Sequence, residues 1–310
     1  YSLSNWDNRI DEWNKQKLGI VQPNRAVTLS RPKPEKGYSR LVPLDLVISK
    51  KLADQGAKIV FWPEGHCYGY TFCSDIRASF KQHIQQMKVP MIIFDSTTQT
   101  IKDVKHHYNA SLLINKYGEL KSQYHKIKLV PFGEYTPLAD NFPFAKDLLG
   151  DYLSQLTPGN ELTTFYAAGL KIVPKICYEP LFPEFVARSV NIDPRGAIIV
   201  VQSQDGWYGK SSQPNQHIAA TLLRAVENRV PLVHVINNGP SVVILPNGRI
   251  SYRSEPFVRG GWTVDLPYDP QEGGTFYTRY PYLFINTIRC LFIFMLLLRI
   301  FSFVTDKSRK

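Results

Sequence analysis

The sequence is poor in cysteine, and none of its cysteines stands in a metal-binding or redox motif. Only four occur among 310 residues, at Cys67, Cys73, Cys177 and Cys290, and no two of them form a C-x-x-C pair. Without that spacing a zinc centre or a thioredoxin-type site has no support, so we expect neither a metal nor another cofactor. Cys67 and Cys73 could pair as a disulfide in an oxidising compartment or remain two thiols, and the sequence leaves both open.

The chain also lacks the signatures of nucleic-acid-binding proteins, although it is basic. Its net charge of +11 fits nucleic acid, anionic lipid or no specific partner. It shows no zinc-finger spacing, no aromatic RNA-binding signature and no basic heptad region, so we expect no nucleic-acid partner. Repeats, low-complexity tracts and a signal peptide are absent too. Because the sequence starts at Tyr1 and not at a methionine, we expect a fragment of a longer protein.

Apolar periodicity predicts a mixed α/β fold. Helical periodicity marks residues 43–55, 75–88 and 213–228, and short apolar runs bounded by turn signals indicate strands. The strands are expected at residues 18–22, 57–62, 89–94, 108–114, 120–125, 197–202, 231–236, 241–245 and 261–266, with a hairpin over 162–176. Since hairpins interrupt the alternation of strands and helices, a mixed α/β sandwich is favoured over a purely parallel sheet.

Composition divides the chain into four parts. We expect a polar lead-in (residues 1–17), a catalytic domain (18–275), a transmembrane helix (283–304) and a basic tail (305–310). The third part is long enough to cross a bilayer, which takes about 20 residues. A buried core helix is the alternative, but residues 290–304 carry a single charge, which favours the membrane.

The residues that flank this apolar segment indicate its orientation. Arg299 lies near its end and can reach a lipid headgroup, whereas a charge at Arg289 is less favourable in the hydrocarbon. Three tyrosines that could form an interfacial belt precede it, at Tyr277, Tyr280 and Tyr282. Three basic residues follow it, Lys307, Arg309 and Lys310. The positive-inside rule therefore places the C-terminal tail in the cytoplasm and the catalytic domain on the opposite side of the membrane.

One short stretch carries a candidate nucleophile. Residues 171–185 read K-I-V-P-K-I-C-Y-E-P-L-F-P-E-F, a strand that ends at Cys177 before a helix that opens at a proline. A cysteine at a strand-to-helix turn lies at the edge of a sheet, where the backbone N–H groups just beyond it face the same space. Taken alone, Cys177 is more often a small buried apolar residue, so its assignment depends on partners elsewhere.

Two further strand ends supply such partners, Glu64 and Lys126. A carboxylate beside the cysteine can take the thiol proton and return it to the leaving group. A lysine ammonium can lower the pKa of the thiol and stabilise an oxyanion, together with the backbone N–H of Tyr178. Individually Glu64 could be a loop or helix-cap carboxylate, and Lys126 a solvated charge beside Lys128.

Together with their sequence contexts, these residues resemble the nitrilase (carbon–nitrogen hydrolase) superfamily. The matching motifs are W-P-E, Y-H-K-I-K-L-V-P-F-G-E-Y-T-P, I-C-Y-E, S-Q-D-G-W-Y-G, Q-H and R-A-V-E-N-R-V-P followed by I-N-N-G. The L-V-P-F-G-E-Y run and the apolar tail are more similar to the membrane branch, the apolipoprotein N-acyltransferases. The resemblance extends from about residue 18 to the tail, and it implies an α-β-β-α sandwich preceded by membrane helices.

The resemblance also implies roles for individual residues. Glu64 matches the general base and Cys177 the nucleophile, while Lys126 matches the oxyanion lysine because it precedes the glutamate of P-F-G-E by eight positions, which excludes Lys128. The further residues that match family positions are the supporting Glu134, Tyr178 and Glu179 and the substrate-binding Trp207.

Three positions depart from the family pattern. Gly65-His66 stands where the family has a small residue after W-P-E, Gln204 replaces the asparagine of S-N-D, and Phe94-Asp95 stands where a glycine is usual. The last two bear on substrate choice more than on chemistry. His66 is expected to be a loop residue, with a role at the mouth of the site as the alternative.

The resemblance implies an acyltransferase of the bacterial inner membrane whose catalytic domain lies on the periplasmic side. A fatty acyl chain would pass from a phospholipid through a thioester on Cys177 to the N-terminal amine of a lipidated protein. A hydrolase of a small amide or nitrile is the first alternative, and a paralogue with another acyl acceptor is the second. A catalytically silent interaction protein is the third, which the intact Glu64, Lys126 and Cys177 disfavour.

Overall fold

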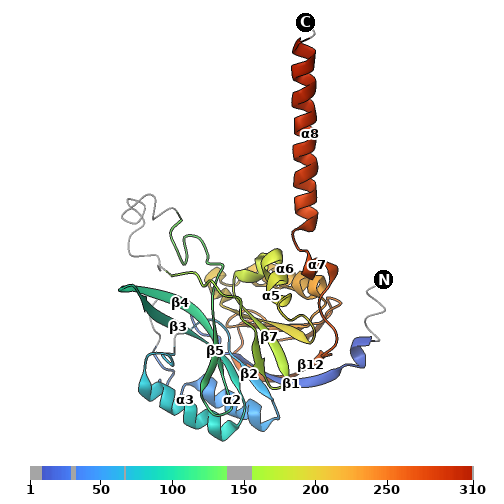
Figure 1. The fold of residues 1–310 in the computed structure, drawn as a ribbon. Helices are drawn as coiled ribbons and strands as arrows, with labels where there is room; N and C mark the ends of the chain where they lie inside the picture. Colours follow the sequence, from blue (N-terminus) through green and yellow to red (C-terminus); the bar gives the residue numbers. More distant parts are fainter. Residues whose placement is uncertain (1–8, 29–32, 66–67, 138–155, 309–310) are drawn as a thin grey trace.

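Two six-stranded sheets stacked face to face form the body of the molecule (Figure 1). The computed structural model describes residues 9–28, 33–65, 68–137 and 156–308, with side chains to residue 302. The first sheet has the order β12-β1-β2-β3-β4-β5, in which β1 is parallel to β2 and β2 to β3. Its strands are β1 (Asn14–Gln22), β2 (Ile59–Phe61), β3 (Met91–Ile101), β4 (Val104–Ile114), β5 (Leu120–His125) and β12 (Gly260–Tyr268).

The second sheet has the order β11-β10-β9-β8-β7-β6, with β7, β8 and β9 parallel. Its strands are β6 (Phe165–Ala167), β7 (Leu170–Ile176), β8 (Ala197–Ser203), β9 (Leu232–Ile236), β10 (Val242–Ile244) and β11 (Ile250–Arg253). Each sheet thus combines a parallel centre with antiparallel edges. The predicted mixed α/β sandwich is confirmed.

Helices cover the outer faces of both sheets. On the first sheet these are α2 (Leu44–Asp54) and α3 (Ser74–Met87), and on the second they are α5 (Pro183–Val190) and α6 (Gln213–Asn228) (Figure 1). Two 3-10 turns, η2 (Glu179–Leu181) and η3 (Asp205–Tyr208), follow β7 and β8. The resulting layers are α-β-β-α, as the sequence predicts.

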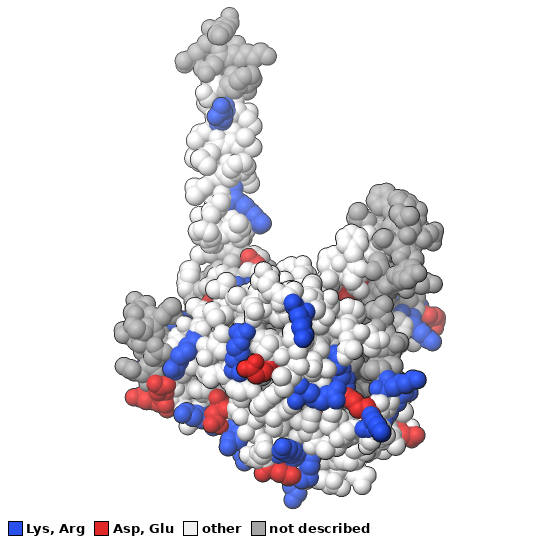
Figure 2. All heavy atoms as spheres, turned by 180° about the vertical axis from the view of Figure 1, so that it is seen from behind, with Lys and Arg blue, Asp and Glu red and all other residues white. Residues whose placement is uncertain are grey.

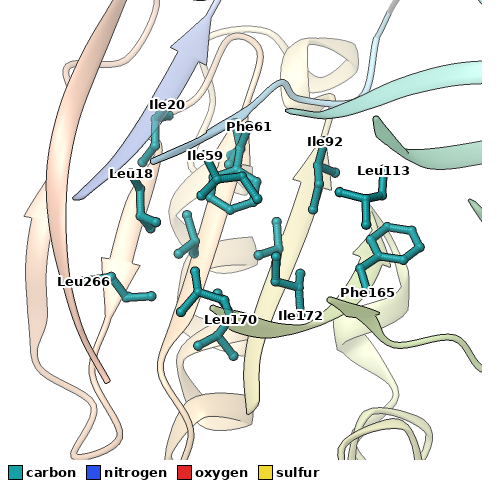
Figure 3. Close-up of a cluster of buried hydrophobic side chains, with 14 of the residues drawn as sticks. Leu18, Ile20, Ile59, Phe61, Ile92, Leu113, Phe165, Leu170, Ile172 and Leu266 are labelled. Carbon is teal, nitrogen blue, oxygen red and sulfur yellow. The ribbon is translucent and has the colours of Figure 1, made fainter. Parts of the chain in front are cut away.

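Apolar side chains from both sheets meet in the space between them. Figure 3 shows Leu18, Phe61 and Ile92 of the first sheet facing Leu170 and Ile172 of β7. Strand β8 is buried on both faces, because alternate residues belong to this inner cluster and to the cluster under α5 and α6. This two-sided burial explains why β8 reads as a continuous apolar run.

The chain leaves the domain through α7 (Phe276–Arg279) and α8 (Leu283–Ser308). A capping box of Thr275 and Thr278 starts α7, and both threonines bind the C-terminal end of α6. The Thr275 hydroxyl donates to the Glu227 carbonyl at 2.6 Å, and the Thr278 hydroxyl donates to the Asn228 side chain at 2.9 Å. Helix α8 therefore begins directly after α7, which is hydrogen-bonded to the end of α6.

Helix α8 extends away from the domain (Figure 1). Residues 283–302 are long and apolar enough to cross a membrane, and none of that segment is buried by the rest of the described chain. Figure 2 shows α8 as an almost uncharged column above a domain face of mixed charge. The prediction of an uncovered apolar helix is confirmed, and the alternative of a core helix is wrong.

Several boundaries differ from the predicted ones. Strand β1 begins at Asn14 and so lies partly in the segment interpreted as a lead-in, and the β3–β4 hairpin extends to Ile101 and Val104. These extensions are polar and mostly exposed, so they lack the apolar alternation that reveals a strand. The sequence analysis also missed β11, which is largely exposed, and the four-residue α7.

Candidate active site

Three strand ends meet where the two sheets face each other. Glu64 follows β2, Lys126 follows β5 of the same sheet, and Cys177 follows β7 of the other sheet. The Lys126 ammonium lies 3.5 Å from a Glu64 carboxylate oxygen, and the Glu64 and Cys177 side chains are close enough for each to shift the pKa of the other. Both Glu64 and Lys126 are buried. The structure thus brings the three sequence-predicted residues together.

Glu134 holds Lys126 from the other side. Its Oε1 accepts a hydrogen bond from the Lys126 ammonium at 2.7 Å and from the Asn109 amide at 2.8 Å, and its Oε2 accepts from the Val130 N–H at 2.8 Å. The lysine is thereby fixed between two carboxylates. Lys128, the neighbour that the family spacing excludes, instead lies over the rings of Phe182 and Phe185.

Glu179 connects the two sheets beside the candidate nucleophile. Its Oε1 accepts from the Tyr124 hydroxyl at 2.6 Å and from the backbone N–H of Ile127 at 2.8 Å and of Lys128 at 3.2 Å. Its Oε2 accepts from the Ile176 N–H at 2.8 Å. One fully buried carboxylate therefore links the segment after Lys126 to the residue before Cys177.

The backbone at Cys177 has a conformation that few residues other than glycine adopt. Its φ is +48°, in the left-handed region, where a side chain costs about 1–3 kcal/mol. Its N–H donates to the Gln202 carbonyl at 2.8 Å, and its own carbonyl accepts from His217 Nε2 at 2.9 Å. Contacts from two neighbouring elements therefore hold the turn.

His217 and Asp205 are the functional candidates that the sequence analysis missed. The ring of His217, on α6, also contacts Asp205 Oδ1 through Nδ1 at 3.0 Å, and the Ser203 hydroxyl donates to the same oxygen at 2.6 Å. Both residues lie in motifs of the family pattern, S-Q-D-G and Q-H, but the motifs do not reveal that the two side chains meet. The only signal in the sequence is the spacing, because Asp205 of the S-Q-D-G motif precedes His217 of the predicted helix by twelve residues.

The charges of the cluster favour a neutral thiol at rest. Burial, followed by the charge of Glu64, raises the pKa of the Cys177 thiol well above its usual value, and Lys126 offsets only part of this. Burial also raises the pKa of Glu64. Burial opposes the Lys126 ammonium, but Glu64, Cys177 and Glu134 outweigh it and raise the pKa of Lys126. Lys126 does lower the pKa of the Cys177 thiol, as expected, but burial and the charge of Glu64 raise this pKa by more.

Accessible aromatic side chains lie on the turn after β8 and next to Cys177 in the chain. Trp207 and Tyr208, at the end of η3, are 56% and 54% exposed, and the electrostatic neighbours of Tyr208 include Cys177 and Lys126. Tyr178 is half-buried, with its ring edge-on to Phe182 at a centroid distance of 5.0 Å. The rim of the site is therefore aromatic and accessible.

The family departures have structural counterparts. The Asp95 carboxylate accepts from the N–H groups of Gly69 and Thr71, both at 3.1 Å, and so holds the segment after Glu64. Gln204 accepts from the Asn237 side chain at 2.8 Å. Cys73 is a free thiol, whereas Cys67 and His66 lie outside the described residues, so the disulfide and a role for His66 stay untested. Among the described residues, no group of three or more His, Cys, Asp or Glu could hold a metal ion.

Comparison with known proteins identifies the family of this chain. The model of the carbon-nitrogen hydrolase family matches residues 19–268, most of the chain. The chain belongs to the carbon–nitrogen hydrolase family. An amidase from Nesterenkonia sp. has a similar structure, with a TM-score of 0.58 at 18% identity over 81% of this chain and 90% of that one. A variant of that amidase is described with covalent addition of an acetamide moiety at its active-site cysteine.

Similar curated members of this carbon–nitrogen hydrolase family are named apolipoprotein N-acyltransferase. The protein of Rickettsia typhi is 34% identical over 76% of this chain and 46% of its own length. That of Geobacter metallireducens is 30% identical over 75% of this chain and 44% of its own length. The chain therefore spans about half the length of these relatives.

Proposed function

We propose that this chain is the catalytic part of an enzyme that transfers a fatty acyl chain from a phospholipid to the N-terminal amine of a lipidated protein. The observation that carries the proposal is the convergence of Glu64, Lys126 and Cys177 in one cluster, in which Glu64 and Lys126 are buried and Cys177 is half-buried. The names of the similar relatives support acyl transfer to nitrogen on an apolipoprotein, the family resemblance supports a phospholipid donor, and the uncovered α8 supports a membrane setting.

In the first half-reaction the Cys177 sulfur attacks the ester carbonyl carbon of the phospholipid while Glu64 accepts the thiol proton. Because the thiol is neutral at rest, proton transfer accompanies the attack and does not precede it. The carbonyl oxygen becomes an oxyanion beside the Lys126 ammonium and the Tyr178 backbone N–H. The C–O bond then breaks, Glu64 returns the proton to the departing oxygen, and the acyl group remains on sulfur as a thioester.

In the second half-reaction the acceptor amine attacks the thioester carbonyl. Glu64 takes a proton from the amine, Lys126 again faces the oxyanion, and the C–S bond breaks. The products are an amide on the lipidated protein and a Cys177 thiol that regains its proton from Glu64. The same three side chains thus serve both steps, and Glu134 and Glu179 hold two of them in place.

The membrane helix and the exposed aromatic rim suit a lipid donor. Helix α8 would cross the bacterial inner membrane with its basic end in the cytoplasm and the catalytic domain on the periplasmic side. We expect Trp207 to contact the acyl chain or the acceptor, and its exposure on the η3 turn that carries Asp205 supports this role. A hydrolase would need water as acceptor and gives no role to an uncovered apolar helix.

The test isolates the first half-reaction. Wild-type protein is incubated with labelled phospholipid and no acceptor, and the adduct on Cys177 is located by mass spectrometry. Cys177→Ser should form no thioester, Glu64→Gln should not be acylated, and Lys126→Ala should be acylated about 10²–10³-fold more slowly. Lys128→Ala, two residues from Lys126, is the matched control and should behave as wild type. A wild type that is never acylated but hydrolyses small amides would instead establish the hydrolase.

A further inference from the structure

His217 lies between two hydrogen-bond acceptors beside the candidate nucleophile. Its Nε2 is 2.9 Å from the Cys177 carbonyl oxygen, and its Nδ1 is 3.0 and 3.2 Å from the two oxygens of Asp205. A carbonyl oxygen can only accept. The Ser203 hydroxyl donates to Asp205 at 2.6 Å, so this carboxylate also acts as an acceptor. Both ring nitrogens of His217 therefore face oxygens that need a proton.

With Asp205 ionised, as its lowered pKa favours, only one protonation state of His217 satisfies both contacts. A neutral imidazole carries one N–H, so one of its nitrogens would present a lone pair to an oxygen lone pair. The imidazolium carries two N–H groups and donates to both oxygens. The ring is 5% exposed, so a mismatched contact would be a costly unsatisfied group. Opposite an ionised Asp205, this geometry places a buried positive charge at His217, balanced by that carboxylate.

The titratable surroundings of this ring agree with a positive charge. Burial opposes the charge, but hydrogen bonding and attraction from Asp205 outweigh it, with smaller contributions from the Cys177 carbonyl and Glu64, and raise the pKa of His217. Burial, with the His217 charge, lowers the pKa of His234 to about 3, so that edge-on ring, with centroids 4.7 Å apart, stays neutral. Despite its burial, the bond to His217 lowers the pKa of Asp205.

We propose that His217 is a positioning residue that acts as an imidazolium and holds the strained turn of Cys177. The inference rests on the proposed acyl transfer only for its kinetic consequence. The carbonyl that His217 binds belongs to the residue with a φ of +48°, so losing the proton releases the contact that restrains this turn. A histidine with a purely structural role would have no such link between its charge and the rate.

The charge state is tested without any substrate. Protein labelled with ¹⁵N-histidine is titrated by NMR, and the His217 signals are assigned by their loss in His217→Gln. We expect both ring nitrogens to be protonated at pH 7 and the proton to leave only at higher pH. Asp205→Asn keeps the size of the partner but removes its charge, so the midpoint should fall. A wild-type His217 with one protonated nitrogen at pH 7 would overturn the proposal.

The kinetic consequence is tested by the acylation rate as a function of pH. Above the His217 midpoint wild type should lose activity by about tenfold per pH unit, because each unit removes that fraction of imidazolium, until its rate reaches that of a protein with a neutral residue at 217. His217→Gln, neutral at all pH, should be slower by about 10–100-fold and lack this limb, and Asp205→Asn should shift it to lower pH. His83→Gln is the control, since His83 faces the Ser79 carbonyl at 2.8 Å on remote α3.

The outcomes of the two tests are distinguishable. If wild type is never acylated, the proposed acyl transfer fails, while the NMR titration still decides the charge of His217. If wild type is acylated and His217→Gln keeps an unchanged alkaline limb, the positioning role of the charge is refuted although the acyltransferase stands.

Discussion

Replacing Glu64 by glutamine should make the Cys177 thiol more acidic while it blocks acylation. With Glu64 and Glu134 ionised around Lys126, the cluster already carries one net negative charge, and a thiolate would add a second. Glu64→Gln removes one of these charges without changing the size of the side chain. The remaining Lys126 ammonium then faces the sulfur with less competition, so the thiolate should form at lower pH.

The size of the effect follows from the contact between Glu64 and the sulfur. Unit charges about 4 Å apart interact by about 4 kcal/mol at an effective dielectric constant of about 20, which sets the scale for neighbours such as Glu64 and the sulfur. About 1.4 kcal/mol corresponds to one pKa unit, so the limit is about 3 units. Because Glu64 also has a raised pKa and shares protons with the thiol, we expect a measured fall of about 1–3 units.

The assay is the rate of alkylation by iodoacetamide as a function of pH, read at Cys177 by peptide mass spectrometry. A Cys177→Ala protein measures the background from Cys67, Cys73 and Cys290. Glu119→Gln, an exposed carboxylate 4.0 Å from Lys81, is the matched control and should leave the profile unchanged. An unchanged or higher midpoint in Glu64→Gln would refute the charge balance described here, and with it the role of Glu64 as acceptor of the thiol proton.

Three further predictions concern the scaffold. Glu179→Gln removes a carboxylate that accepts hydrogen bonds from both sheets, so it should lower the free energy of unfolding by about 1–3 kcal/mol in urea titrations. Glu161→Gln, at an exposed position, is the control and should leave that free energy unchanged. Burial lowers the pKa of Lys175 to about 8, so the unfolded chain binds more protons between about pH 8 and 10.5 and wild-type stability should rise with pH there. Lys175→Met should lose this rise, and an identical pH dependence in both proteins would contradict the assignment. Truncation before Leu283 should release the domain from membranes into the alkaline-carbonate supernatant, and a protein that stays in the pellet would show that α8 is not the anchor.

The sequence predicts those helices and strands that bury one face or both faces in a core, because their apolar residues recur with a regular period. Helix α6 has the predicted bounds, and the two predicted hairpins, β4–β5 and β6–β7, are present, because apolar period and glycine turns coincide there. The exposed ends of β3 and β4 could not be predicted in this way. Their backbone pairing is maintained by the ladder and not by side chains that reach the core.

The meeting of Glu64, Lys126 and Cys177 was predictable because strand ends are visible in the sequence. The left-handed backbone of Cys177 was not, since tertiary contacts impose it on a residue with no preference for it. The same holds for the two linkers of the site. Glu179 joins strands of different sheets, and His217 reaches a carbonyl forty residues away along the chain. Such pairings depend on packing in three dimensions and leave no local period.

Helix α6 joins the candidate active site to the base of the apolar helix α8. His217 lies near its start, and Asn228 at its end accepts the hydrogen bond from Thr278 of α7, which directly precedes α8. Eleven residues of helix separate them, a length of about 17 Å. One hydrocarbon leaflet is about 15 Å thick. Because this length exceeds one leaflet, an ester raised by the whole of α6 would draw its acyl chain out of the hydrocarbon, so the proposed acyl transfer requires α6 to lie tilted toward the membrane plane.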